Sequence, residues 1–332
     1  MDEAAIKTRR PRFVLQERPW LNRQRAIALS YVVALILYVV TGIYSPGFLS
    51  LNHLRILAVS ASILGIVAAG QTLVILTGGI DLSVSSVLTA SAIVTTLHSS
   101  SDQDLWHVLP LVFLMAAGVG LINGVAVSAL HLPAIIVTLG TAGVLQGALL
   151  VSTSGGQTGA ALPPAALTYL ADGDVGPIPT SLLCWILLTW LVSTLLSRMP
   201  FGRKVYAIGN GPIVARMTGV NIVFTLSVVY VFSALCAAFA GLLLAGDLGT
   251  TYLSMGDTYL FTSISAVLIG GASILGGRGH YLGTVAGVII LTGIGGLLAI
   301  LNQGPATLAI IYGVIILVTV GVATAAQRGV RR

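Results

Sequence analysis

Asp81 is the residue with the clearest capacity for chemistry, because it is a lone carboxylate in a nearly continuous apolar stretch. The segment from Gly70 to Ser91 reads GQTLVILTGGIDLSVSSVLTAS, and a Gly-Gly pair interrupts it just before the aspartate. An unpaired charge at the centre of a helix in lipid costs roughly 2.5 to 3.5 kcal/mol. Asp81 therefore marks either a transport path, where it could titrate, or a helix end, where its carboxylate caps a helix that follows Ser83.

The elements around Asp81 must be membrane helices. Hydrophobic residues make up 56% of the 332 residues and charged residues only 8%, which predicts an all-α, polytopic membrane protein. The net charge of +6 does not indicate nucleic-acid binding, because the basic residues are separated by membrane side and form no stripe. Cys184 and Cys236 lie in apolar runs, and none of the five histidines has ligand spacing to another, so neither a disulfide nor a metal site is expected.

Runs of suitable length and hydropathy predict about ten transmembrane helices. These are residues 26–44, 55–76, 83–98, 106–129, 133–153, 181–197, 223–246, 258–274, 282–301 and 306–325. The positive-inside rule places both termini in the cytoplasm, with a basic arm over 1–25, one transmembrane domain over 26–325 and a basic tail over 326–332.

Loop charges agree with this topology. The external loops hold the acidic residues Asp102, Asp104, Asp172, Asp174, Asp247 and Asp257. Arg55 is the exception, and we expect it to reach the headgroups from the outer end of the second span. The external loop over 154–180 is too polar to span, and is either a docking surface or a solvated connector.

Two glycine-rich breaks interrupt the predicted helices. One is Gly78–Gly79, after which the third span is only about 24 Å long at 1.5 Å per residue. The other, GGASILGGRGHYLG, holds a turn at Gly276, Gly277, Arg278 and Gly279. Paired irregularities in the two halves indicate a functional centre in transporters, although such glycines also serve close packing or short turns.

The largest internal loop, residues 198–222, predicts a short helix over Pro212–Thr218, because proline suits the first helical turn and Gly219 suits the stop. This helix either binds a partner or rests on anionic lipid through Arg203, Lys204 and Arg216.

Polar residues inside the predicted spans are mostly neutral: Gln71, Thr72, Asn123, Thr138, Thr141, Gln146 and Ser263. They suit the passage of an uncharged polyhydroxy solute better than that of an ion, unless they are simply interhelical hydrogen bonds.

A family resemblance rests on these same motifs. GGIDLS, Asn123-Gly124, the run Thr138 to Thr141, the FGR and YAIG sequences of the internal loop and the GGRG turn together resemble the permease subunit of bacterial ABC importers for ribose, xylose, arabinose and related monosaccharides. This family belongs to the branched-chain-permease superfamily.

The resemblance implies a transport subunit of the bacterial inner membrane that is not itself an enzyme. Its partners would be a second permease, identical or not, a cytoplasmic ATPase that binds ATP and Mg, and a periplasmic solute-binding protein. The chain lacks the G-x-x-x-x-G-K-[ST] phosphate loop, so the ATPase must be another polypeptide.

The resemblance also assigns roles to residues. Coupling to the ATPase would fall to Pro212, Val214, Ala215, Arg216, Met217 and Gly219. From the polar residues within the spans and from the first break, and not from the resemblance, we expect the translocation path to include Gln71, Gly78, Gly79, Asp81, Ser83, Asn123, Thr138 and Thr141. Carboxylates usual in the family are absent at Ile213, Leu260 and Thr262.

Two other functions remain open at this point. One is a proton-coupled secondary transporter or channel that uses Asp81, and the other is an ABC permease for amino acids.

Overall fold

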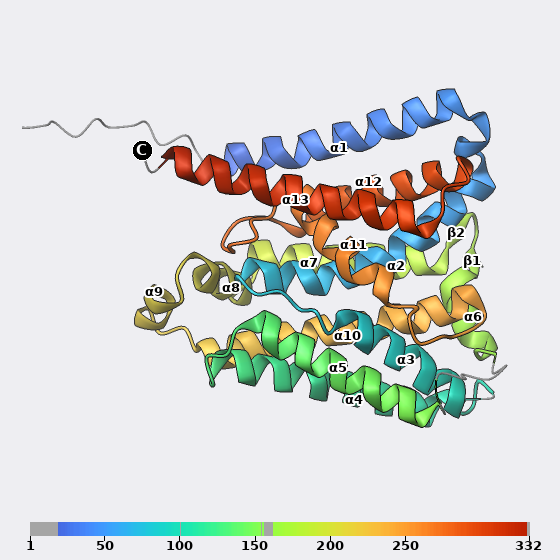
Figure 1. Cartoon of the computed structure of the whole chain (residues 1–332), viewed down its shortest axis with the longest axis horizontal. Coiled ribbons are helices and arrows are strands. Elements are labelled where there is room, and N and C mark those ends of the chain that lie inside the picture. Colours follow the sequence, from blue (N-terminus) through green and yellow to red (C-terminus); the bar gives the residue numbers. More distant parts are fainter. Residues whose placement is uncertain (1–18, 100, 154, 156–161, 331–332) are drawn as a thin grey trace, which may run out of the picture.

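The computed structural model describes residues 19–99, 101–153, 155 and 162–330. Helices run back and forth between the two ends of a bundle (Figure 1). One end carries the short helix α6 (Ala165–Asp172), and the opposite end carries α8 (Pro200–Asn210) and α9 (Pro212–Met217). The predicted orientation places the α6 end outside the cell and the α8–α9 end in the cytoplasm.

Every range predicted to span contains a helix. These helices are α1 (Pro19–Tyr44), α2 (Leu51–Leu76), α3 (Val84–His98), α4 (Leu105–Ser128), α5 (Ala134–Ser152), α7 (Thr180–Arg198), α10 (Ile222–Leu248), α11 (Asp257–Ile269), α12 (Tyr281–Ile300) and α13 (Pro305–Val330). Within the described residues, seven helices are long and apolar enough to cross a membrane unaided. The chain is therefore a multi-pass membrane protein, and the count of ten spans stays a prediction.

The core of the bundle is built from α2 and α10. α10 packs against α2, α3, α4 and α6, and α2 also packs against α7, α11 and α12. Both central helices are apolar all round, as expected of helices enclosed by others. Side-chain caps fix where they begin: Ser50 accepts from the backbone N–H of His53 and Asn221 from that of Phe224, which satisfies groups that a helix leaves unpaired at its first turn.

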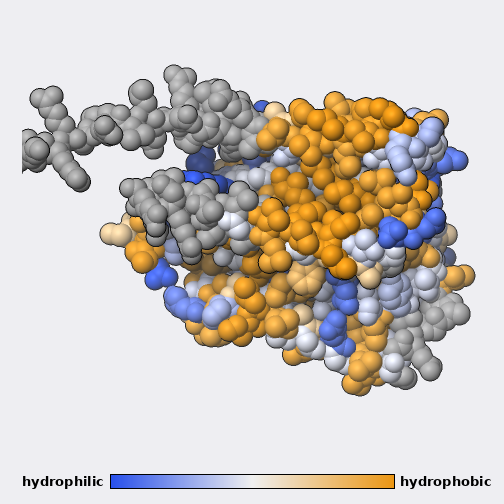
Figure 2. All heavy atoms as spheres, turned by 45° about the horizontal axis from the view of Figure 1, so that its top comes forward, coloured by the Kyte–Doolittle hydropathy of each residue, from blue (hydrophilic) through white to orange (hydrophobic). Residues whose placement is uncertain are grey.

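Outer helices leave much of their surface uncovered by this chain. Only 17% of the α5 span and 22% of the α1 span are buried within the protomer. Figure 2 shows that the face bearing α1 is hydrophobic across its middle, with hydrophilic residues gathered toward the ends. Such a band suits contact with lipid or with another membrane subunit.

Several elements differ from the sequence prediction. The loop over 154–180 holds α6 and a small antiparallel hairpin, β1 (Asp174–Val175) and β2 (Ile178–Pro179). A 3-10 turn, η1 (Pro46–Leu49), joins α1 to α2. The internal loop contains α8, an amphipathic helix that the prediction missed, and α11 ends at Ile269 and not at residue 274.

Asp257 was wrongly assigned to an external loop. The segment after α10 turns back into the bundle, and the backbone N–H of Gly256 donates to Oγ1 of Thr89 at 3.1 Å. Thr89 lies nine residues before the end of α3 at His98, which is roughly 14 Å along a helix that rises 1.5 Å per residue. Asp257 is nevertheless exposed on the protomer.

Candidate functional site

The break between α2 and α3 holds a buried, hydrogen-bonded carboxylate. Asp81 has no solvent-exposed surface. Its Oδ1 accepts from the backbone N–H of Ser83 at 3.0 Å and from Oγ of Ser83 at 2.6 Å. Its Oδ2 accepts from Oγ of Ser233 on α10 at 2.8 Å. The carboxylate is thus held by neutral donors, and within the described residues it has no basic partner.

Asp81 accepts an N–H at the start of α3, as the helix-cap hypothesis expected, but it is not the N-cap residue. α3 begins at Val84, and its N-cap position is Ser83. Asp81 lies two residues before this N-cap position and accepts the N–H of Ser83 itself, whereas an N-cap side chain at Ser83 would accept from the N–H of Ser85 or Ser86. The carboxylate instead closes a local turn that fixes Ser83 at the start of the helix.

A chain of hydrogen bonds extends from Asp81 to α4 and α5. Asn123 donates from Nδ2 to Oγ of Ser83 at 2.9 Å, and Thr141 donates from Oγ1 to Oδ1 of Asn123 at 2.8 Å. Thr138 accepts the backbone N–H of Leu82 at 3.0 Å and donates to the carbonyl of Ala134 at 2.9 Å. We call Asp81, Ser83, Asn123, Thr138, Thr141 and Ser233 the polar network.

Five of the eight predicted path residues therefore meet in this network. Gln71 does not join it: its side chain is fully buried, and neither polar atom has a hydrogen-bond partner in the described residues. The sequence analysis missed Ser233 and Tyr230. A Cβ on Gly79 would lie 2.6 Å from the Tyr230 hydroxyl, which is buried without a partner in the described part. Isolated hydroxyls in an apolar span carry no sequence signal that distinguishes them from packing residues.

Three glycine-containing segments meet at the α8–α9 end of the bundle. The backbone N–H of Gly277 donates to the carbonyl of Leu76, the last residue of α2, at 2.9 Å. A Cβ on Gly209 of α8 would stand 1.9 Å from that same carbonyl oxygen and 2.4 Å from the Gly277 nitrogen. A Cβ on Gly276 would lie 2.8 Å from the Gly78 nitrogen. Backbone contact this close is possible only without side chains.

Side chains of α8 add to this contact, which we call the glycine junction. Asn210 donates from Nδ2 to the carbonyl of Gly277 at 3.3 Å, and the Tyr206 hydroxyl donates to the carbonyl of Gly279 at 2.8 Å. Gly78, Gly276, Gly277 and Gly279 have positive φ angles of 87°, 85°, 72° and 135°, a region that disfavours other residues. The two breaks predicted from sequence thus touch each other and the internal loop.

The predicted short helix is present as α9, one residue shorter than expected. Ala215 points inward, 2% exposed, and packs with Ile208, Ile222 and Leu226. Val214 and Met217 are 64% and 84% exposed. Gly219 has a φ of 82°, which explains why the chain turns there.

The α9 surface is therefore apolar where it is most exposed, with Ile213 at 78% exposure beside Val214 and Met217. Arg216 is also exposed. An exposed apolar patch next to a basic side chain suits a protein partner with an acidic, partly apolar groove.

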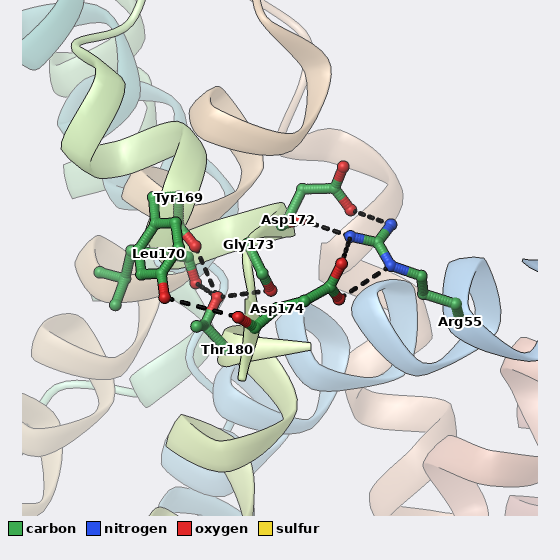
Figure 3. Close-up of polar contacts among 7 residues, drawn as sticks. All are labelled: Arg55, Tyr169, Leu170, Asp172, Gly173, Asp174 and Thr180. Carbon is green, nitrogen blue, oxygen red and sulfur yellow. Dashed lines mark hydrogen bonds and ion pairs between the residues drawn. The ribbon is translucent and has the colours of Figure 1, made fainter. Parts of the chain in front are cut away.

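At the opposite end, Arg55 binds the last residue of α6 and the first residue of β1 (Figure 3). Its Nη1 lies 2.7 Å from Oδ1 of Asp172, and its Nε lies 3.1 Å from Oδ1 of Asp174. Nη2 also donates to the backbone carbonyl of Asp172. Arg55 lies near the start of α2, as predicted, and the finding that the prediction lacked is its pairing with protein carboxylates. Thr180 further ties α7 to α6 by donating to the carbonyl of Tyr169 at 2.6 Å.

Comparison with known proteins places this geometry in a family. Residues 54–320 match the family described as branched-chain amino acid transport system / permease component. The chain belongs to this permease family. The match includes both breaks, the polar network and α8–α9.

Named relatives cover most of this permease. It is 31% identical over 269 residues to the ribose import permease protein RbsC of Haemophilus influenzae, covering 79% of this chain and 82% of the relative. It is 33% identical to the autoinducer 2 import system permease protein LsrC of Klebsiella pneumoniae, with 82% and 78% covered. It is 29% identical to the L-arabinose transport system permease protein AraH of Escherichia coli, with 87% and 88% covered. No solved structure matches it.

Proposed function

We propose that the chain is the transmembrane subunit of a binding-protein-dependent ABC importer. It moves a sugar or a similar small uncharged polar solute into the cytoplasm, and a separate subunit hydrolyses the ATP. The observation that carries the proposal is the glycine junction, because it brings the segment that would bind an ATPase into backbone contact with both helix breaks.

The contacts give this coupling a physical route. α9 presents Ile213, Val214 and Met217 outward, while α8, one residue away along the chain, contacts the last carbonyl of α2 and the GGRG turn. Helix α9 has six residues, too few to be stable alone. The position of α9 therefore depends on the packing of Ala215 against its neighbours and on the partner that covers the exposed face of the helix.

The polar network supports an uncharged cargo. Apart from Asp81, its members Ser83, Asn123, Thr138, Thr141 and Ser233 are neutral, and the described residues give Asp81 only hydroxyl and amide donors. The relatives named for ribose, arabinose and autoinducer 2 import agree with a small polyhydroxy cargo.

The proposal includes three protein partners and a location. A second permease, identical or homologous, would complete the membrane unit, and an ABC ATPase with ATP and Mg would bind the α8–α9 end. A periplasmic solute-binding protein would deliver cargo at the α6 end. The assembly would lie in the bacterial inner membrane. We propose no catalytic site, cofactor, metal or nucleic-acid partner for this chain.

Reconstitution tests the proposal. Proteoliposomes that hold the permease and the ATPase should accumulate radiolabelled ribose or arabinose only with ATP on the cytoplasmic side and loaded binding protein outside. A parallel set without ATPase receives a proton gradient. Accumulation driven by that gradient alone would replace the ABC importer with a proton-coupled transporter that uses Asp81.

The same vesicles separate sugar import from amino-acid import. Unlabelled leucine and unlabelled sugars are supplied as competitors together with their own binding proteins. Competition by the amino acid alone, with normal ATP dependence, would keep the importer and change its cargo.

A further inference from the structure

A cavity of about 340 Å³ lies between α2, α11, α12 and α13, away from both the polar network and the glycine junction. It is in the half of the bundle nearer the α6 end, since it is lined by the first part of α2 and the last part of α12. Its polar lining residues are His53, Ser60, Thr258, Tyr259, Thr262, Thr292 and Tyr312. None of its described lining residues is Asp, Glu, Lys or Arg.

Several polar atoms at this cavity have no partner within the described residues. Nε2 of His53 is buried and makes no hydrogen bond. The hydroxyls of Ser60, Tyr259 and Tyr312 likewise have no hydrogen bond to any described residue. An unpaired polar group away from water costs free energy. The buried Nε2 of His53, together with three unpaired hydroxyls at the cavity wall, therefore favours an occupant that can both donate and accept hydrogen bonds.

The rim of the cavity indicates that water or protein, and not hydrocarbon, lies beside it. Asp257 directly precedes the lining residues Thr258 and Tyr259. It is exposed on the protomer, although Gly256 contacts Thr89 far along α3. A carboxylate at the level of Thr89, part-way along α3, would lose much solvation free energy if it faced lipid. It is acceptable in a water-filled passage or at an interface between subunits.

We propose that this cavity binds the transported solute, a neutral polyhydroxy molecule, on the outer side of the permease. The proposal rests on the proposed function and locates its cargo site. Hydroxyl and imidazole groups would exchange hydrogen bonds with the hydroxyls of the solute. The aromatic faces of Tyr259 and Tyr312 and the side chains of Leu57 and Leu291 would cover its C–H surface. The volume falls within the range of about 300 to 1,000 Å³ found for small-molecule sites.

A lipid acyl chain is the competing occupant. It would leave the buried Nε2 of His53 without a hydrogen-bond partner, at a cost of about 1–3 kcal/mol. It would also leave the hydroxyls of Ser60, Tyr259 and Tyr312 unpaired against hydrocarbon. The arrangement of polar groups therefore favours a solute that carries hydroxyls.

Thiol labelling in the assembled transporter distinguishes the two occupants. Ser60→Cys is made in a background of Cys184→Ala and Cys236→Ala, and the probes are a membrane-impermeant glycosyl methanethiosulfonate and apolar N-phenylmaleimide. Ser62→Cys is the matched control, because Ser62 is fully buried on the same helix and donates to the Ala58 carbonyl. The glycosyl reagent should label Ser60→Cys at least about tenfold faster than Ser62→Cys, since thiol reactivity follows exposure to the reagent.

Filling the cavity supplies a second readout. A Cβ on Gly295 would meet only the Tyr312 hydroxyl, at 3.8 Å, so Gly295→Leu projects into the cavity without a backbone clash. Ribose or arabinose uptake should fall at least about tenfold, because the side chain takes the space of the solute. Gly313→Leu on α13, where nothing lies within 4 Å of a Cβ, should transport normally.

The outcomes separate failure of this site from failure of the importer. Labelling of Ser60→Cys by the maleimide alone would assign the cavity to lipid. Normal uptake by Gly295→Leu in vesicles that need ATP and binding protein would overturn the cavity site and leave the importer intact. Loss of the ATP requirement in the wild type would instead overturn the proposed function, whatever the labelling shows.

Discussion

Gly209→Ala is the sharpest test of the glycine junction, because the added methyl group has no room. Its Cβ would lie 1.9 Å from the Leu76 carbonyl oxygen and 2.4 Å from the Gly277 nitrogen, whereas ordinary van der Waals contact begins at 3.4 Å. The added Cβ of the Gly209→Ala variant would therefore be about 1.5 Å too close to the Leu76 carbonyl oxygen, and α8 must move away from α2 and the GGRG turn by about that distance. The same movement separates or strains the 2.9 Å hydrogen bond from Gly277 to Leu76.

The expected penalty follows from those contacts. Inserting a methyl group into a packed contact costs about 1–3 kcal/mol, and at 1.4 kcal/mol per factor of ten this equals roughly 5- to 140-fold in an equilibrium. If the junction is intact in only one conformation of the transport cycle, the population of that conformation falls by this factor. The free energy of unfolding should fall by no more than this penalty, because the rest of the α2–α10 core is untouched.

The assay measures ATP hydrolysis and solute uptake in the same proteoliposomes. Gly209→Ala should assemble with the ATPase and hydrolyse ATP, but transport fewer solute molecules per ATP. Gly211→Ala is the control two residues later: a Cβ there meets only Val214, at 3.9 Å, and its φ of 168° is extended backbone. Unchanged uptake and hydrolysis in Gly209→Ala would refute a role of the junction in coupling.

Three further substitutions test other parts of the site. Asp81→Asn should keep most uptake, since an amide can replace the carboxylate toward its hydroxyl partners, while Asp81→Leu should lose it; abolished uptake in normally expressed Asp81→Asn would support an obligatory charge. Arg55→Ala should lower stability in detergent by about 1 kcal/mol, the upper range for exposed ion pairs, and the effect should shrink in high salt; a thermal shift that is equal at all salt concentrations would contradict this. Arg216→Glu and, separately, Ala215→Trp should insert normally but weaken copurification of the ATPase or uncouple its hydrolysis; normal copurification and transport in both would make α9 a lipid-resting segment.

Hydropathy predicted the helical framework because each span is specified locally. A run of apolar residues long enough to cross the bilayer has few alternatives to a helix, and glycine pairs mark where such runs must break. The locations of both breaks and of α9 therefore followed from sequence. The end of α11 did not, because GGASILGG remains apolar enough to resemble a continuing helix.

The sequence did not predict which residues far apart in the chain contact each other. Nothing local connects Ser233 to Asp81, which are 152 residues apart, or Arg55 to Asp172 and Asp174. The depth of Asp257 was also hidden, since a carboxylate beside a polar turn is typical of a loop. Amphipathic α8 was missed because its polar and apolar residues were interpreted as an irregular loop.

The polar network and the glycine junction share one short segment, and this makes their coupling measurable. Leu76 ends α2 at the junction, and only Thr77 to Leu82 separate it from Ser83, where the hydrogen bonds toward Asn123 begin. This segment is not helical, so a displacement of α8 is expected to shift the turn that holds Ser83. Spatial continuity alone is not evidence of energetic coupling.

A double-mutant cycle supplies that evidence. Gly209→Ala is combined with Asn123→Ala, and the uptake rate per ATP is measured for the wild type, both single variants and the double variant. We expect a coupling energy of about 0.5–2 kcal/mol, as found along coupled networks. Gly209→Ala with Arg55→Ala is the control pair, at opposite ends of the bundle, and its effects should add within about 0.3–0.5 kcal/mol. Additivity in both pairs would mean that the junction and the polar network act independently, and that movement of α8 reaches the transported solute by another route.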